Sequence, residues 1–414
     1  MVYVAVLGHG VVGSGVLELF YKNRDSIVAK AGEDIDIKYI LDLRDFPGLP
    51  YSDKFVKTFD VIINDPEIRV VVEVMGGLDP AYNYVSSALS AGKSVVTSNK
   101  ELVAAYGAEL LQIACRTNSN FLFEASVGGG IPIIRPLSQC LAANEVTEIA
   151  GILNGTTNFI LTKMIHENMN FSDALSLAQQ LGYAEHDPAA DIEGHDSCRK
   201  ICILASLAFG RHVYPRDVHT EGITAITLDD VRYAAAWGGV IKLIARVKKL
   251  PDGRLSAMVS PAFIKSDSQL ANVSDVFNGI MVRGDAIGDV VFYGRGAGKL
   301  PTASAVVADV IDCAKHLNAR KYLGWLPAKD GYVCDYLEAP SVFFVRAQVH
   351  NRAAALKAAS SLFGKVYEIV EPDMPMGEFA FITPELPEGD LSRALGSFAS
   401  LDYTIVSKIR VLDY

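Results

Sequence analysis

The sequence predicts an α/β protein whose first domain is built on a parallel sheet. The run from Val2 to Leu7 is short and apolar, and it ends in a turn with three glycines. The residues after this turn have the apolar spacing of a helix, so the chain begins as strand, glycine turn and helix. After Pro340 the composition changes, and a strand, a helix and further strands follow. These observations predict a Rossmann-type first domain, an α+β middle domain and a small C-terminal βαββαβ domain.

The length and composition exclude several classes of protein. The chain has 414 residues, enough for two or three domains, and 50% of them are hydrophobic while 21% are charged. Because 38 Lys and Arg residues are outnumbered by 48 Asp and Glu residues, we expect a small-molecule ligand and no nucleic-acid partner. The N-terminus does not resemble a signal peptide, and no apolar run has membrane-spanning length. The six cysteines are scattered, which indicates reduced thiols in a cytoplasmic protein.

The turn after the first strand, GHGVVG, has the spacing of a dinucleotide-binding loop. Its first glycine permits a tight turn, the second lets the backbone approach a pyrophosphate, and the third lets the helix pack on the strand. The alternative is a purely structural glycine turn. The strand before the motif and the helix after it favour the dinucleotide site. The candidate cofactor-binding residues are Gly8, Gly10, Val11, Val12 and Gly13.

The second strand, near Ile35 to Leu41, is followed by Asp42 and Arg44. A carboxylate at this point accepts hydrogen bonds from the free ribose 2′-hydroxyl of NAD, whereas a guanidinium pairs with the 2′-phosphate of NADP. Either residue is also compatible with a solvated strand end. The two residues therefore indicate different cofactors.

Further strands are expected at Val70 to Val74 and at Ser94 to Thr97, with ligand-binding residues at their carboxyl ends. Lys100 lies there, in SNKELVAAYG, where the ordinary interpretation is a lysine at a helix start. A strand from Phe121 to Ala125 leads into a loop with three successive glycines. Glutamate and carbonyl oxygens in this region suit a monovalent cation, and the alternative is a flexible crossover loop. The candidate ligands are Glu124, Val127, Gly129 and Ile131.

Two more segments place polar groups at helix starts. The sequence ILNGTTN opens a helix, and Thr156 is in a suitable position to cap it. Alternatively, the backbone N–H groups of Gly155 and Thr156 bind a substrate carboxylate. Farther along, a glycine-rich run through Gly298 precedes the helix containing Ala303 to Ile311. Such a helix start is suited to cover the nicotinamide half of a dinucleotide.

The segment from Ala178 to Lys200 concentrates carboxylates in a turn-rich stretch before an apolar helix. Asp196 and Lys200 are expected on one face of that helix, which alone is also typical of a surface ion pair. A divalent-metal loop formed by Asp187, Asp191 and Glu193 is a further alternative, although Lys200 would compete for the same oxygens.

The whole segment resembles the signature of homoserine dehydrogenases. The matching positions are Ala178, Gly182, Tyr183, Asp187, Pro188, Asp191, Gly194, Asp196 and Lys200. The resemblance extends along the chain in order, through the cofactor loop, the NK-x-x-VA element, the glycine loop, ILNGTTN and GxGAG-x-x-PTASAV. After Pro340 the strand and helix pattern resembles an ACT domain, a module that often binds amino acids.

This resemblance implies the NAD(P)H-dependent, reversible reduction of L-aspartate 4-semialdehyde to L-homoserine, a step toward threonine, methionine and isoleucine. It implies NADP more than NAD, because Arg44 stands where NADP-using members often carry a basic residue. Lys200 is the expected general acid, assisted by Lys100 and oriented by Asp196. The remaining implied contacts are Glu185 and Asp191 to the substrate ammonium, Gly182 and Tyr183 through their backbone, Lys100, Glu185 and Gly298 to the cofactor, and a sodium ion at Glu124, Val127, Gly129 and Ile131.

The expected domain limits are 1–135 with about 296–320 for the dinucleotide-binding domain, 136–295 for the substrate-binding and dimerisation domain, 321–340 for a linker and 341–414 for the ACT-like domain. A homodimer or tetramer is implied by resemblance, and the fused aspartokinase form is not expected.

Ala354 replaces a family glycine at a turn, where its methyl disfavours a positive φ and thus binding of an effector such as threonine. Alternative functions are another amino-acid dehydrogenase and a cofactor-bound amino-acid sensor without turnover.

Overall fold

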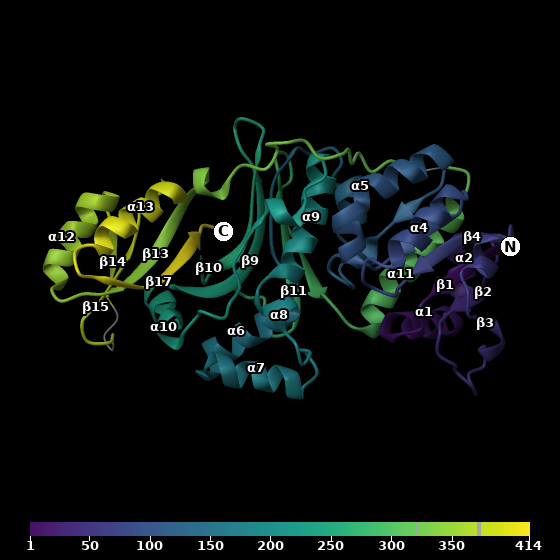
Figure 1. The fold of residues 1–414 in the computed structure, drawn as a ribbon, viewed down its shortest axis with the longest axis horizontal. Coiled ribbons are helices and arrows are strands. Elements are labelled where there is room, and N and C mark those ends of the chain that lie inside the picture. The colour runs from purple at the N-terminus through teal and green to yellow at the C-terminus, as the bar shows by residue number, and fades with distance from the viewer. Residues whose placement is uncertain (320, 371–373) are drawn as a thin grey trace. The chain divides into compact units, whose positions relative to one another are not determined.

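The computed structural model describes residues 1–319, 321–370 and 374–414 (Figure 1). The chain forms two compact units. The first comprises Met1–Val146, Arg199–Pro215 and Gly294–Lys329, and the second comprises Thr147–Cys198, Arg216–Tyr293 and Asp330–Tyr414. Each unit is therefore assembled from segments that are far apart in the sequence.

The first unit contains a sheet of six parallel strands in the order β3-β2-β1-β4-β5-β6. This order is that of the Rossmann fold, whose strand order reverses beside β1, and it confirms the predicted fold class of the N-terminal region. The strands are β1 (Val2–Leu7), β2 (Ile35–Leu41), β3 (Phe55–Val56), β4 (Ile68–Glu73), β5 (Ser94–Thr97) and β6 (Phe121–Leu122).

Helices cover this sheet. Helices α1 (Val11–Lys22), α2 (Arg24–Ala31) and α11 (Lys299–Lys315) share one apolar core with strand residues such as Val4 and Val72. Helices α4 (Ala81–Ser90) and α5 (Lys100–Thr117) pack against each other, and the short α3 spans Asp60–Ile63. The expected strand from Phe121 to Ala125 is shorter than predicted, because a 3-10 turn replaces it from Glu124 to Ser126. Further single turns span Ser52–Lys54 and Pro136–Cys140.

The second unit is organised around a large mixed sheet with the order β12-β11-β7-β9-β10-β17-β13-β15-β14. Its middle part packs on a core that includes Ile152, Ile244 and Met281. The strands of this part are β7 (Val146–Ile152), β8 (His219–Thr220), β9 (Gly239–Lys249), β10 (Leu255–Lys265), β11 (Phe277–Gly284) and β12 (Gly288–Arg295). The helices are α6 (Gly155–Glu167), α7 (Phe171–Gln180), α8 (Ala189–Ile192) and α10 (Leu228–Trp237), and a 3-10 turn spans Pro215–Asp217.

The described residues after 339 form five strands and two helices, one short strand (β16) more than the predicted βαββαβ order, with a core that includes Phe343, Phe379 and Phe398. The elements are β13 (Pro340–Gln348), α12 (Arg352–Phe363), β14 (Tyr367–Ile369), β15 (Glu378–Ile382), β16 (Leu386–Pro387), α13 (Glu388–Ala399) and β17 (Thr404–Leu412), preceded by a turn at Tyr336–Glu338. We call them the C-terminal module. Its strand β17 pairs in parallel with β10, so the module extends the middle sheet.

A buried ion-pair network joins the module to the rest of the second unit. Arg410 of β17 binds Glu388 of α13 with two nitrogens, at 2.7 and 2.6 Å, and its third nitrogen lies 2.8 Å from Glu221. The residue after Glu221 is Gly222, and a Cβ at that position would overlap the carbonyl oxygen of Ile192 in α8. The network therefore reaches the turn that carries Asp191.

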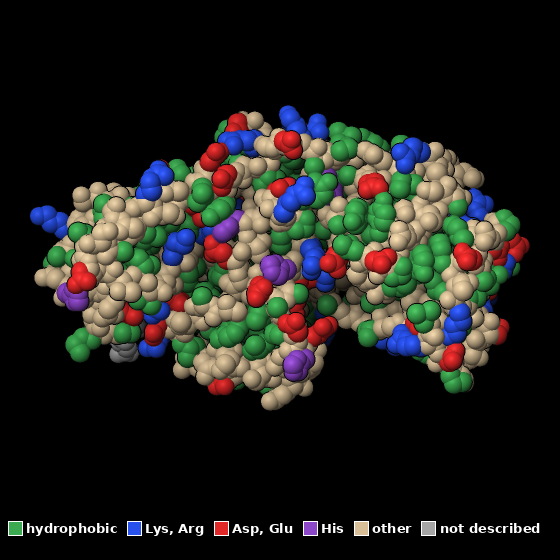
Figure 2. All heavy atoms as spheres, viewed as in Figure 1, with side chains coloured by type: hydrophobic (Ala, Val, Ile, Leu, Met, Phe, Trp, Pro, Cys, Tyr) green, Lys and Arg blue, Asp and Glu red, His purple; other side chains and the backbone are tan. Residues whose placement is uncertain are grey.

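Within each unit, acidic and basic side chains alternate over the face seen in Figure 2 without a large area of one sign. Among the described residues, no helix combines the length and the apolar character needed to cross a bilayer. The six cysteines, all among the described residues, form no disulfide.

Candidate active site

The glycine turn after β1 is shaped as the sequence predicted. Gly8 has φ +98°, which favours glycine, and a Cβ at Gly13 would overlap the carbonyl oxygen of Gly8. Helix α1 begins at Val11 with Gly10 as its N-cap, and no side chain caps it. Its first N–H groups are therefore open to an anion, as a pyrophosphate requires.

Asp42 and Arg44, which the sequence left as competing indications, bind each other. The backbone N–H and Nε of Arg44 donate to Oδ1 of Asp42, at 2.9 and 3.0 Å. The backbone N–H of His9 and Nη2 of Arg44 donate to Oδ2, at 2.8 and 2.9 Å. Hydrogen bonding from Arg44 holds the pKa of Asp42 well below its usual range. A carboxylate has about four acceptor positions, so all of them are used.

The guanidinium of Arg44 keeps donors for a ligand. Nη2 also donates to the carbonyl of His9 at 3.2 Å, and the Arg44 side chain is 64% exposed. Its Nη1 donates no hydrogen bond to any described residue. The ring of Phe46 lies beneath the guanidinium at 5.2 Å. The arrangement presents two N–H groups of a fixed cation to solvent.

Lys100 is the first residue of α5, and the strand ends beside it are tied together. Asn99 caps the helix by accepting from the N–H of Leu102 at 3.1 Å, and it donates to the carbonyl of Gly77 at 2.6 Å. The buried Glu73 accepts from Thr97 at 2.6 Å, and burial raises the pKa of Glu73. Lys100 is therefore anchored at the carboxyl edge of the sheet, where ligands bind in this fold.

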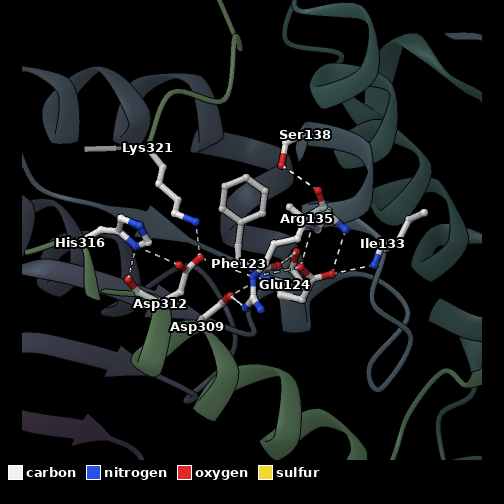
Figure 3. A network of polar contacts seen from close by, with 11 residues as sticks. Phe123, Glu124, Ile133, Arg135, Ser138, Asp309, Asp312, His316 and Lys321 are labelled. Carbon is white, nitrogen blue, oxygen red and sulfur yellow. Dashed lines mark hydrogen bonds and ion pairs between the residues drawn. The ribbon is translucent and has the colours of Figure 1, made fainter. Parts of the chain in front are cut away.

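The carboxylate of Glu124 is hydrogen-bonded to backbone N–H groups of the segment after the glycine loop. Its Oε1 accepts from the N–H groups of Ile133 and Ile134, at 2.7 and 2.8 Å, and its Oε2 accepts from the N–H of Arg135 at 2.9 Å (Figure 3). Arg135 also contacts Asp309 of α11. Burial raises the pKa of Asp309 to about 7. The carboxylate thus closes the glycine loop through these three N–H groups.

The backbone of the same loop remains suited to a cation. Val127, Gly129 and Ile131 are buried, and no described residue donates a hydrogen bond to their carbonyl oxygens. A Cβ at Gly129 would lie 2.5 Å from the carbonyl oxygen of Gly296, so the loop is pressed against the approach to α11. Gly298, with φ +123°, is the N-cap of α11. Among the described residues, no group of three His, Cys, Asp or Glu side chains is placed to hold a metal ion.

In the second unit, the start of α6 organises the acidic segment. Helix α6 is capped by Asn154, whose Oδ1 accepts from the N–H of Thr157 at 2.8 Å. The interpretation of Thr156 as the cap was wrong, because the cap lies two residues earlier, at Asn154, and the helix begins at Gly155. The Nδ2 of Asn154 donates to Asp191 at 2.7 Å and to Asp196 at 2.9 Å. Two carboxylates from α8 and α9 therefore converge on one side-chain amide.

The other predicted substrate residues surround this helix start. Thr156 donates to the carbonyl of Tyr183 at 2.7 Å, and Gly155 is packed against the carbonyl of Val276. Gly182, with φ +74°, ends the turn after α7. Glu185 is exposed, and its carbonyl accepts from Gln179 at 3.1 Å.

Helix α9 runs without interruption from His195 to Phe209, as its apolar spacing predicted. Asp196 and Lys200 are one turn apart on it, and both side chains are buried, at 4% and 7% exposure. A solvated surface ion pair is therefore excluded. Neither Asp187 nor Glu193 joins Asp191 in a metal cluster.

Asn154 was missed as a site residue by sequence reasoning. It lies inside the motif ILNGTTN, and an Asn before a helical run is a recognised capping signal. Its second task is not visible from local sequence, because its two carboxylate partners lie 37 and 42 residues farther along the chain.

The chain is similar to known proteins in sequence and in fold. The family model described as homoserine dehydrogenase matches residues 132–311, and the model of its NAD binding domain matches residues 8–124. Homoserine dehydrogenase of Bacillus subtilis (strain 168) is 35% identical over 421 residues, covering 96% of this chain and 95% of its own. A crystal structure of a homoserine dehydrogenase from Thiobacillus denitrificans has a TM-score of 0.90 at 33% identity, covering 100% of this chain and 98% of that chain.

A hyperthermophilic archaeal homoserine dehydrogenase in complex with NADPH has a TM-score of 0.63 at 28% identity and covers 75% of this chain and 97% of its own. The ranges matched by the two family models contain the cofactor loop, the start of α6 and the acidic segment. The chain therefore belongs to the homoserine dehydrogenase family, the NAD(P)-dependent oxidoreductases that act on the CH–OH group of homoserine.

Proposed function

We propose that this enzyme prefers NADP(H) for the reversible reduction of L-aspartate 4-semialdehyde to L-homoserine. The carrying observation is the saturated carboxylate of Asp42, on which a ribose 2′-hydroxyl would have to displace an existing donor. The Nη1 group of Arg44 is instead available to a 2′-phosphate. The archaeal relative in complex with NADPH is consistent with this preference.

When bound, the nicotinamide supplies the hydride, and the protein must supply a proton to the carbonyl oxygen. We assign this proton to Lys200, because an ammonium both stabilises the developing alkoxide and donates to it. The burial of Lys200 excludes most bulk water from its amine. Lys100, fixed at the start of α5, is assigned to align the carbonyl.

The acidic side chains are assigned to the substrate's amino group. Asp191 is half-buried and held by Asn154, whereas Glu185 is exposed and reaches from the turn after Tyr183. The N–H groups of Gly155 and Thr156, at the start of α6, suit the substrate carboxylate. An amino acid is thus matched at both of its charged ends.

A sodium ion with a structural role fits the glycine loop. The carbonyl oxygens of Val127, Gly129 and Ile131 are buried and lack donors within the described chain, a costly state that a hard cation relieves. Because the carboxylate of Glu124 is occupied by backbone N–H groups, its backbone carbonyl is the oxygen we assign to the ion.

We further propose an ACT-like role for the C-terminal module and a homodimer as the working assembly. The expectation of a turn at residue 354 was wrong, because Ala354 lies in the first turn of α12, where its N–H donates to the side chain of Asn351 at 3.0 Å. The expected left-handed turn is absent at this position. Since this N–H is occupied, we expect no inhibition by threonine.

Initial rates with both cofactors, each with and without threonine, test the proposal. We expect kcat/KM for NADPH to exceed that for NADH by at least about tenfold, with no effect of threonine. Equal or higher efficiency with NADH would overturn the cofactor assignment. Inhibition by millimolar threonine would overturn the regulatory assignment, and sedimentation would decide the assembly.

A further inference from the structure

We infer that Asn154 is a positioning residue that fixes Asp191 and Asp196 for substrate handling. The inference rests on the proposed function, in which Asp191 binds the substrate's amino group, and on the expectation that Asp196 orients the proton donor Lys200. All three residues belong to the second unit, and their contacts are made within it.

Every polar group of the Asn154 side chain has a partner. Its NH₂ group donates one hydrogen bond to Asp191 and one to Asp196, at 2.7 and 2.9 Å. Its Oδ1 accepts from the N–H and the hydroxyl of Thr157, at 2.8 and 3.0 Å. A flipped amide would place oxygen against two carboxylates and NH₂ against an N–H donor. The contacts therefore determine the orientation of the amide.

The backbone on both sides makes Asn154 rigid. It lies two residues after β7 and caps α6, and its side chain is buried. Gly155, next in the chain, is packed closely against the carbonyl of Val276, so this helix start has little freedom to shift. Sites carried by regular elements hold their geometry better than sites on loops.

The arrangement answers an electrostatic need. Two carboxylates that converge on one point repel each other, and burial makes this repulsion costly. The amide donates a separate hydrogen to each carboxylate, and these two hydrogen bonds stabilise both charges at one point. Asp191 and Asp196 are thereby held at a set position relative to the N–H groups of Gly155 and Thr156, which the proposed function assigns to the substrate carboxylate.

A simple helix cap is the competing role, and the chain offers a matched control for it. Asn170 caps α7 by accepting from the N–H of Asp173 at 2.9 Å, and its amide also donates to the Asp173 carboxylate at 2.8 Å. No residue assigned to substrate or cofactor contacts Asn170 in the described chain. Replacing Asn170 thus tests capping without the convergent carboxylates.

The test compares Asn154→Asp and Asn154→Ser with Asn170→Asp and Asn170→Ser. Asp and Ser both keep a capping oxygen but lack the NH₂ donors. We expect the Asn154 variants to raise KM for homoserine about 10- to 100-fold, with KM for NADP nearly unchanged and a shifted pH profile of kcat/KM. Asn154→Asp should raise KM for homoserine more than Asn154→Ser does, since it adds a third carboxylate beside Asp191 and Asp196. The Asn170 variants should keep native kinetics.

Native KM and pH profile in folded Asn154→Ser would overturn the inference. If Asn154→Asp fails to fold by circular dichroism, Asn154→Ser still decides. Asp191→Asn and Asp196→Asn, measured in parallel, distinguish a failure of the proposed substrate roles from a failure of the positioning role of Asn154. If these two variants behave as wild type, the proposed substrate roles fail; if they are impaired while Asn154→Ser is not, only the role of Asn154 fails.

Discussion

Replacing Arg44 by alanine should shift cofactor preference from NADP toward NAD. In the structure this side chain does two things at once. It saturates Asp42 with two side-chain hydrogen bonds, at 3.0 and 2.9 Å, and it presents Nη1 to solvent. Removal therefore deletes the cation assigned to the 2′-phosphate and returns two acceptor positions to Asp42 for a ribose hydroxyl.

The size of the effect follows from the remaining donors. Nη1 carries two N–H groups, and a charge-assisted hydrogen bond to phosphate typically changes affinity by about tenfold. Arg44 is well exposed, so salt weakens both contacts. We therefore expect KM for NADPH to rise about tenfold at physiological ionic strength and more at low salt. KM for NADH should stay the same or fall, because the backbone donors of His9 and Arg44 still orient Asp42.

Steady-state kinetics at two salt concentrations, with homoserine saturating in the oxidative direction, measure both constants. Arg254→Ala is the matched control, because Arg254 also binds an aspartate two residues earlier, with Nε 2.7 Å from Asp252 and its N–H 3.0 Å from the same carboxylate. It lies in the turn before β10, in the second unit. If Arg44→Ala changes KM for NADPH no more than Arg254→Ala does, the assignment of Arg44 is refuted.

Three further predictions follow from the site. Lys200→Ala should lower kcat by about 100- to 10,000-fold while fluorescence titration still detects NADPH binding, and near-native turnover would contradict its role as acid. Because burial raises the folded pKa of Asp309 to about 7, stability falls as pH rises from 4 to 7 and then levels off. Between pH 6 and 8, wild type should therefore lose about 1 kcal/mol of unfolding free energy relative to Asp309→Asn, and equal urea curves would argue against this. Exchanging sodium for choline should lower Tm, and an unchanged Tm would exclude the carbonyl cation site.

The parts of the fold that the sequence predicted are those determined by local patterns. The limits of β2 and β5 agree with the predicted runs, because β2 begins with alternating apolar and charged residues and β5 is centred on two valines. The start of α9 at His195 agrees for a similar reason, since Gly194 ends the preceding turn with φ +87°. Motif spacing indicated the residues around α6 and α9 in the same way.

What the sequence could not provide depends on contacts between distant segments. Whether Glu124 faces a cation or the N–H groups of Ile133 to Arg135 is decided by the folded loop. The double donation by Asn154 requires α8 and α9 to approach the start of α6. The parallel pairing of β10 with β17 joins segments that no periodicity connects.

The ion-pair network of Arg410, Glu388 and Glu221 makes the C-terminal module a support for the turn that carries Asp191. Without the guanidinium of Arg410, the buried carboxylate of Glu388 would lose its main cationic partner. Glu221, whose neighbour Gly222 packs against the carbonyl of Ile192, would lose its ion pair with Arg410. Substitutions confined to the C-terminal module that raise thermal stability can therefore also lower catalytic activity. Selection of such variants by melting temperature alone would overlook enzymes that bind the amino-acid substrate more weakly.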